Sequence, residues 1–420
     1  MRKKIGWTRK ITGACLLLFS LWMAFSPTAA AVRALPETFR LGVGQTYALS
    51  SGATVLSSTD ERLVSSSGAA MSGVSAGETE VSVRLFGLFP LKKLNVDVEE
   101  NVTLIPGGQA VGVALKTGGV LVVGLSDVAG KNPARDAGIR AGDVILSVDG
   151  KTIESSEALT MLVAQSEGRV LSVTYERDGK NESVQVTPAK QETVWRLGVW
   201  VRDSTAGVGT LSFYDRETHY YGALGHAISD TDTGKILPVR LGSLMKARIV
   251  DLKKGARGAP GELRGSFLDE PGELGNILKN SAFGIYGKAD EEIVNPIYPN
   301  GLPVAPRDSV KTGKATILST ILGTEMHEYE VEIVSLARQG SASQKSMVLR
   351  VTDQELLEKT GGIVQGMSGS PIIQNGRIVG AVTHVFVDDP TQGYGIYIEW
   401  MLENERALQK ATESEQDNAA

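Results

Sequence analysis

The chain lacks disulfide-forming cysteines, an excess of basic charge and extended helical periodicity. Cys15 is the only cysteine among 420 residues, so no internal disulfide can form. The 43 Lys and Arg residues are outnumbered by 48 Asp and Glu, and no basic stripe stands out, which argues against a nucleic-acid partner. Glycine is abundant at 48 residues. This composition favours many short strands joined by tight turns, in two or three domains.

Long apolar runs are also scarce, and the one at the N-terminus is short. Five basic residues among positions 2–10 precede apolar residues 11–25, and small residues follow at 26–31. The run falls short of the roughly 20 residues of a membrane span. It predicts an export signal over 1–31, with a retained anchor as the alternative, and both place the rest of the chain outside the cytoplasm.

Cys15 lies near the start of this run, whereas a lipoprotein cysteine follows its apolar run, so we expect no lipid attachment. An exported chain without disulfides fits the cell envelope of a Gram-positive bacterium better than an animal secretory route.

Residues 35–98 alternate apolar and polar positions between turns. Residues 79–85 and 94–98 are predicted strands of period two. The pattern predicts a small, β-rich, immunoglobulin-like module. Nothing in it offers chemistry, so we interpret it as a spacer or docking module.

Residues 101–189 resemble the PDZ domains of bacterial proteases. The resemblance is carried by residues 133–150, which read PARDAGIRAGDVILSVDG. A short helix is expected to end at Gly138 in a left-handed conformation, a strand to span 144–148, and Asp149-Gly150 to form the next turn.

Two further segments of this domain bear on ligand binding. Val111-Gly112-Val113 matches the carboxylate-binding loop of PDZ domains, and Leu159 and Val163 recur on a predicted helix over 156–166. Such domains capture a peptide tail as an added strand, which is the predicted function here. The alternative is a domain that only packs against its neighbours.

Residues 192–403 form the third predicted unit, in which short apolar stretches recur. Helical patterning occurs mainly at 352–359 and from 399 to about 410. We expect a mainly β chain overall, and in this unit two β-barrels closed by a C-terminal helix. Residues 404–420 hold the end of that helix and a polar tail, and 413–420 are predicted to be disordered.

The sequence Gly366-Met367-Ser368-Gly369-Ser370-Pro371 presents a serine between glycines ahead of an apolar strand. Chymotrypsin-like proteases present their nucleophile in this way, which makes Ser368 the candidate nucleophile. The amides of Gly366 and Ser368 are the expected oxyanion hole. Ser370 is the competing serine, interpreted as a small residue that keeps the turn tight. A plain Gly/Ser turn is the alternative for the whole motif.

The base is expected to be histidine, whose unperturbed pKa lies near neutrality. His226 precedes the serine, as the chymotrypsin order requires, and lies among small and apolar residues. Its alternative is a core histidine. Of the other histidines, His219 is interpreted as part of a solvated turn and His327 as lying at a strand edge. His384 is interpreted as a structural residue at the cleft.

The orienting acid is less well defined by the sequence. Asp353 begins a predicted helix, where capping is a sound structural role. Asp251 and Asp269 suit the chymotrypsin topology better, because the acid of that fold lies nearer the histidine along the chain.

Together these segments resemble the stage IV sporulation protein B (SpoIVB) peptidases of endospore-forming bacteria. The strongest matches are 223–226 with Asp230, 360–371, 383–387 and 393–400. The resemblance implies that Asp353 is the acid. It further implies a serine peptidase that is exported from the forespore into the space between the two spore membranes.

The resemblance also implies partners. Such enzymes cut themselves near the N-terminus and cleave a membrane-bound regulator, which leads to processing of pro-sigma-K, and their PDZ domain is implied in self-recognition and target binding. We expect neither a cofactor nor a metal.

Two other functions stay open. One is a non-catalytic PDZ adaptor with an inert barrel. The other is a housekeeping envelope protease of the high-temperature-requirement type, although in that type the protease precedes the PDZ domain. Gly362, six residues before Ser368, offers no charge to a specificity pocket, which argues weakly against a basic substrate residue.

Overall fold

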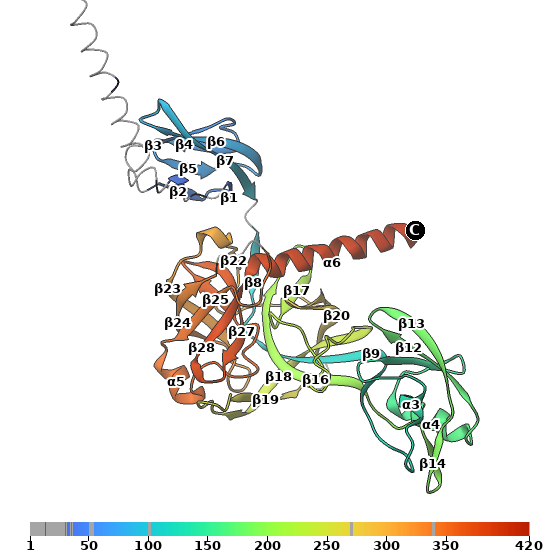
Figure 1. Cartoon of the computed structure of the whole chain (residues 1–420). Helices are drawn as coiled ribbons and strands as arrows, with labels where there is room; N and C mark the ends of the chain where they lie inside the picture. The colour runs from blue at the N-terminus through green and yellow to red at the C-terminus, as the bar shows by residue number, and fades with distance from the viewer. Residues whose placement is uncertain are drawn as a thin grey trace, which may run out of the picture. The chain divides into compact units, whose positions relative to one another are not determined.

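The computed structural model describes residues 37–49, 54–99, 102–268, 272–337 and 341–419, with Gly13, Ala30, Val32, Arg33 and Leu35. Most of the predicted leader 1–31, and Asp269, lie outside the described residues. Among the residues that are described, no helix has both the length and the apolar character needed to cross a membrane. The chain divides into two units, Met1–Val102 and Thr103–Ala420 (Figure 1).

The N-terminal unit is a sandwich of two small sheets, with strand orders β1-β7-β6-β3 and β2-β5-β4. Alternate residues of both sheets point into one apolar core, as period-two patterning requires. The strands predicted at 79–85 and 94–98 lie within β6 and β7. The strands are β1 (Thr38–Gly42), β2 (Thr46–Ala48), β3 (Thr54–Ser58), β4 (Val64–Ser67), β5 (Ala70–Gly73), β6 (Gly77–Leu85) and β7 (Phe89–Glu99).

Six strands of the second unit pair in a closed ring, in the order β9-β18-β20-β21-β17-β16 and back to β9. Their inward side chains form one apolar core, so this ring is the first barrel. The ring strands are β9 (Ala110–Leu125), β16 (Val199–Tyr214), β17 (Tyr220–Ala223), β18 (Leu241–Lys253), β20 (Glu273–Ser281) and β21 (Gly284–Ala289). Strands β8 (Thr103–Pro106), β19 (Glu262–Phe267) and β22 (Leu302–Pro303) pair beside the ring.

The PDZ elements are inserted between the two long strands β9 and β16, which run side by side out of the barrel (Figure 1). Gly118 of β9 has a φ of +71°, which favours glycine, and the pairing of β9 with β16 shifts register around it. Around a separate core lie α3 (Pro133–Asp136), β10 (Val144–Val148), β11 (Lys151–Thr152), α4 (Ser156–Gln165), β12 (Leu171–Arg177), β13 (Lys180–Val186), β14 (Ala189–Gln191) and β15 (Val194–Arg196).

This insertion corrects the prediction for Val111, Gly112 and Val113. They lie near the start of β9, paired on one edge with β16 and on the other with β18, inside the first barrel. A carboxylate-binding loop needs free amides, so this segment is not one here. Period-two patterning of a segment carries no information about the sheet in which it pairs.

Leu159 and Val163 of α4 are buried in the PDZ core, together with Leu197 of the chain's own following segment. Trp195 and Val199 pack against the same core. A cavity of about 190 Å³ lies between this segment and α4. The side of α4 that was expected to flank a bound peptide is therefore covered by residues 194–201 in this structure.

The second barrel is closed in the order β23-β24-β25-β28-β27-β26. Its strands are β23 (Gly313–Ser319), β24 (His327–Leu336), β25 (Met347–Val351), β26 (Pro371–Gln374), β27 (Arg377–Phe386) and β28 (Asp389–Tyr397), with the short helices η1 (Arg307–Ser309) and α5 (Gln354–Thr360). The predicted class, mainly β with a PDZ domain and barrels, is confirmed.

Helix α6 (Ile398–Ala419) follows β28 and packs on strands of both barrels. It extends to Ala419, so the prediction of disorder over 413–420 is wrong up to that residue, where good helix formers such as Ala, Glu and Gln continue the helix. Glu405 on its inner face is only 3% exposed. Burial, with the charge of Asp215, raises the pKa of Glu405 to about 7.

Candidate active site

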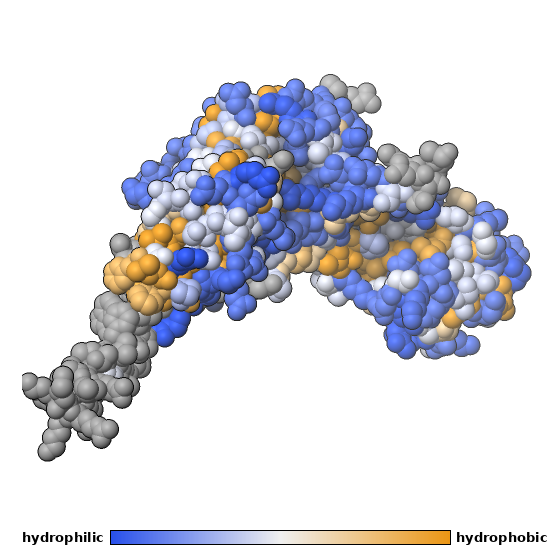
Figure 2. Space-filling model, turned by 90° about the horizontal axis from the view of Figure 1, so that it is seen from above, coloured by the Kyte–Doolittle hydropathy of each residue, from blue (hydrophilic) through white to orange (hydrophobic). Residues whose placement is uncertain are grey.

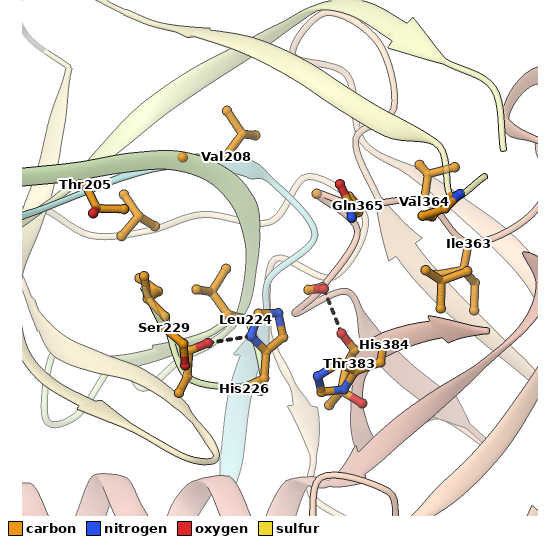
Figure 3. Close-up of a pocket in the computed structure, with 18 of the residues that line it drawn as sticks. Thr205, Val208, Leu224, His226, Ser229, Ile363, Val364, Gln365, Thr383 and His384 are labelled. Carbon is orange, nitrogen blue, oxygen red and sulfur yellow. Dashed lines mark hydrogen bonds between the residues drawn. The ribbon is translucent and has the colours of Figure 1, made fainter. Parts of the chain in front are cut away.

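A cavity of about 610 Å³ is lined by residues of both barrels (Figure 3). Strands β9 and β16 and the loop after β17 contribute from the first barrel, and the loop before β26 and strand β27 contribute from the second. His226 and Ser368 both line this cavity. The structure thus brings the predicted base and nucleophile, 142 positions apart in the sequence, to one site.

The nucleophile loop connects α5 to β26 and depends on glycines. Helix α5 ends at Gly361 in a left-handed conformation, and Gly366 and Gly369 have φ values of +99° and +98°. A Cβ atom on Gly369 would lie 2.0 Å from the carbonyl oxygen of Thr210. The loop can therefore approach the first barrel only with glycine at this position.

Thr210 of β16 connects the segments that carry Ser368 and His226. Its amide donates to the carbonyl of Ser368 at 3.0 Å, and its hydroxyl donates to the carbonyl of Gly366 at 2.8 Å. Its own carbonyl accepts from the amide of Leu224, two residues before His226, at 3.2 Å. Sequence reasoning missed Thr210, because a threonine in a strand gives no sign of a partner 156 positions away.

The amides of Gly366 and Ser368 have no hydrogen-bond acceptor among the described residues, whereas both carbonyls are held by Thr210. An oxyanion site consists of such unengaged, fixed N–H groups. The predicted oxyanion hole is therefore compatible with the structure, and Thr210 is the residue that fixes the peptide planes around it.

His226 follows a sharp turn in which Leu224 and Gly225 have φ values of +69° and +70°. Its Nδ1 lies 2.8 Å from the carbonyl of Ala227. An Nδ1–H that donates to this carbonyl leaves Nε2 free to accept a proton. Burial lowers the pKa of His226, against a smaller opposing effect of the Ala227 carbonyl, so the imidazole is neutral at pH 7.

The loop after His226 is braced by a buried carboxylate. Asp230 accepts hydrogen bonds from the amides of Asp232 and Thr233, at 3.1 and 2.8 Å, and pairs with Arg202 of β16. Burial raises the pKa of Asp230, but the bonds from Thr233 and the charge of Arg202 outweigh it, and the pKa is lowered. Asp230 therefore holds the loop rather than the imidazole.

The hydroxyl of Ser368 donates to the carbonyl of Thr383 at 2.8 Å (Figure 3). Within the described part of the chain there is no hydrogen bond between Ser368 and His226. For Ser368 to act as a nucleophile with His226 as its base, its hydroxyl would have to turn from Thr383 toward Nε2 of His226. A rotation about one side-chain bond is a small change, and such contacts often tighten only with substrate.

A second imidazole faces the site. The ring centroids of His384 and His226 are 5.0 Å apart, and both rings border the cavity (Figure 3). Burial, the neighbouring His226 and Lys345 lower the pKa of His384 to about 4. His384 is therefore neutral at pH 7 and adds no charge beside the base.

The structure does not place Asp353 as the orienting acid. One carboxylate oxygen of Asp353 caps α5 by accepting from the amide of Leu356 at 2.9 Å, and the other accepts from the amide of Glu330 at 3.3 Å. Asp353 does not line the cavity, and Nδ1 of His226 faces Ala227 instead. Asp251 is exposed and pairs with Arg264, so it does not take this role either.

The remaining candidates lie outside the cavity. Ser370 is buried and its amide closes the nucleophile turn on Met367. His219 bonds to Tyr214, and His327 lies at a strand end near Glu325. In the described ranges, no group of three or more His, Cys, Asp or Glu side chains is arranged to hold a metal.

Comparison with known proteins identifies two segments. The family model described as SpoIVB peptidase S55 matches residues 193–402, and that of a PDZ domain matches residues 101–187. Among curated proteins, the chain is 32% identical over 80 residues to "Probable protease eep" of Enterococcus faecalis, covering 18% of this chain and 19% of that protein. It is 36% identical over 86 residues to "Probable periplasmic serine endoprotease DegP-like" of Halomonas elongata, covering 20% and 16%.

These curated relatives are matched over less than a quarter of their length. Among solved structures, the Rv3671c protease of M. tuberculosis in its active form is 14% identical with a TM-score of 0.27, covering 47% of this chain and 72% of that chain. The PDZ domain of an SdrC-like protein of Listeria monocytogenes is 24% identical with a TM-score of 0.18, covering 20% and 87%.

The S55 match covers half of the 420 residues and contains both His226 and Ser368. The chain belongs to the SpoIVB peptidase S55 family.

Proposed function

We propose that this chain hydrolyses peptide bonds with Ser368 as the nucleophile and His226 as the general base. The observation that carries the proposal is the convergence of these two residues on one cavity between two barrels, beside the unengaged amides of Gly366 and Ser368. The nucleophile, the general base and the oxyanion site that acyl transfer needs are then all supplied by residues of this chain.

The geometry supplies a mechanism. Nε2 of His226 takes the proton as Ser368 Oγ attacks the substrate carbonyl, and the amides of Gly366 and Ser368 stabilise the oxyanion. The imidazolium then gives its proton to the leaving amine, and water releases the acyl group by the same route. The Ala227 carbonyl, which accepts from Nδ1, performs the orienting role that a carboxylate has in other enzymes of this type.

The cavity wall points to the substrate class. Apart from the two neutral imidazoles, its lining side chains carry no ionisable group. The apolar members are Val113, Val208, Leu224, Ile228, Pro260, Ile363, Val364, Val385 and Val387. Burial of apolar surface favours uncharged, apolar substrate side chains next to the cleaved bond.

The finer biology is proposed from the family. The enzyme is exported from the forespore to the space between forespore and mother cell, cleaves itself near the N-terminus, and cleaves a membrane-bound regulator so that pro-sigma-K is processed during sporulation. Membership of the S55 family supports this role. Peptide-tail binding by the PDZ domain stays a prediction, because residues 194–201 cover α4.

Intact-mass measurement of the purified chain tests the proposal. Wild-type protein is expected to shorten itself over time, and Ser368→Ala to remain at full length with an unchanged melting temperature. Ser370→Ala, at the buried neighbouring serine, is the matched control and should still shorten. Self-shortening by purified Ser368→Ala would exclude Ser368 as the nucleophile.

A non-catalytic PDZ adaptor is the second candidate. The observation in its favour is the Ser368 hydroxyl, which bonds to Thr383 and not to His226. If the adaptor role were correct, wild type and Ser368→Ala would both stay at full length and neither would react with a fluorophosphonate, which labels activated serines only.

A further inference from the structure

The hairpin between β6 and β7 ends in large apolar side chains that face solvent. Phe86 and Leu88 are 55% and 75% exposed, and Leu88 is the most exposed large hydrophobic residue in the described part of the chain. Figure 2 shows hydrophobic surface gathered at one end of the N-terminal unit. A contiguous exposed patch of this kind marks an interaction site.

The exposed tip is not needed for the core of the sandwich. Leu85, just before it, is buried, and Val83 lies in the core with Leu94 of β7, so the base of the hairpin is anchored. The side chains of Phe86 and Leu88 project beyond this anchor. These two apolar side chains are therefore available to contact a partner outside the sandwich.

The tip has a defined conformation that ordinarily excludes an aromatic residue. The amide of Leu88 donates to the carbonyl of Leu85 at 3.0 Å and closes the turn. Phe86 and Gly87 have φ values of +52° and +73°. Asn or Gly is usual at such left-handed positions in a tight hairpin turn, and a bulky residue there is strained. A strained, exposed phenylalanine points to a function rather than to folding.

The charge around the tip identifies its partner. Residues 81–96 contain Arg84, Lys92 and Lys93 and no acidic residue. Arg84 and Lys93 are exposed, and Lys93 pairs with Glu80 at the surface. Aromatic and aliphatic side chains flanked by Lys and Arg partition into the interface of an anionic bilayer, where the rings sit at headgroup depth and the cations meet lipid phosphate.

We propose that the tip Phe86–Leu88 inserts into the interface of an anionic membrane and holds the N-terminal unit against the lipid surface. A second copy of this chain, or the rest of the chain folded over the tip, is the alternative occupant that the test below distinguishes from lipid. The proposal concerns the sandwich alone and does not depend on catalysis by Ser368.

The test uses the full chain with one dye attached to one introduced cysteine. This is simple because the chain has a single native cysteine. Cys15→Ser removes the only cysteine, and Leu88→Cys then carries an environment-sensitive NBD dye. Glu61→Cys is the matched control, because it is exposed in the turn at the opposite end of the β3–β6 pairing. The vesicles are phosphatidylcholine with about 30% phosphatidylglycerol, or phosphatidylcholine alone.

With anionic vesicles, the dye at residue 88 should brighten several-fold, shift to the blue and be quenched by nitroxide on shallow acyl-chain positions, whereas the dye at residue 61 should not change. Adding Arg84→Glu to the residue-88 reporter should weaken its response several-fold. Equal responses at 88 and 61, or at 88 on both vesicle types, would overturn the proposal. A dye at 88 that is already shielded without vesicles would also overturn it, in favour of protein contact.

Discussion

The hydroxyl of Thr210 offers the sharpest perturbation of the proposed machinery, because it holds the oxyanion loop without lining the cavity. Thr210→Val keeps the shape and the strand preference of the side chain but removes the 2.8 Å bond to the Gly366 carbonyl. Leaving a buried acceptor unpaired costs about 1–3 kcal/mol. If that cost falls on the transition state, the rate drops about 5- to 150-fold, since each 1.4 kcal/mol is tenfold.

The assay is the rate of fluorophosphonate labelling as a function of probe concentration. The limiting rate should fall in Thr210→Val while the half-saturating concentration stays within about twofold, because residue 210 does not contact the bound probe. Thr210→Ser keeps the hydroxyl and is the rescue control, with a limiting rate expected near the wild-type value.

Two results would refute this reasoning. A limiting rate of Thr210→Val equal to wild type would show that the hydroxyl does not position the loop. A loss that Thr210→Ser shares in full would show that packing of the threonine methyl, and not its hydrogen bond, is responsible.

Three further predictions follow from glycine geometry and from the shifted pKa values. Gly369→Ala should abolish labelling, because its Cβ would clash with backbone of Thr210, whereas Gly376→Ala, also at positive φ but in open space, should cost only about 1 kcal/mol of stability and keep activity. The acid limb of the labelling rate should lie below pH 6.5, because burial lowers the pKa of His226; a limb above 6.5 would contradict the neutral buried base. Because the folded-state pKa of Glu405 is raised to about 7, its contribution to stability is fully present below about pH 4.5 and is lost as pH rises through 7. Relative to wild type, Glu405→Gln should therefore gain up to about 3 kcal/mol in free energy of unfolding above pH 7, measured by urea unfolding across pH. A difference in free energy of unfolding between the two proteins that does not change with pH would contradict this prediction.

Local patterns in the sequence predicted much of the fold correctly. The turn residues on either side located strand β10, and the cap residue Asp353 begins helix α5 as its chemistry requires. Ser368 and His226 were recognised because glycines beside each leave a distinctive local signature.

Long-range pairing could not be predicted in the same way. Residues 110–116 alternate as a strand should, but only the folded chain shows that they pair with β16 and β18 in the first barrel. Val113 consequently lines the active-site cavity and not a PDZ groove. Asp353 shows both cases. Its role as a helix cap was predicted from local sequence and is confirmed, whereas its catalytic role was implied only by the family resemblance.

The hydrogen-bond partner that orients His226 could not be predicted from the sequence, for a physical reason. A backbone carbonyl, that of Ala227, accepts from Nδ1, and every residue has such a group, so no residue type marks it.

The central claim is that Ser368 is made nucleophilic by His226, and mapping the labelled residue tests it most directly. Wild-type protein is treated with a fluorophosphonate, digested and sequenced by mass spectrometry, beside Ser368→Ala, Ser370→Ala and His226→Ala. The account predicts one adduct, on Ser368, which persists in Ser370→Ala and is lost in the other two. An adduct on another serine, or undiminished labelling of Ser368 in His226→Ala, would contradict it.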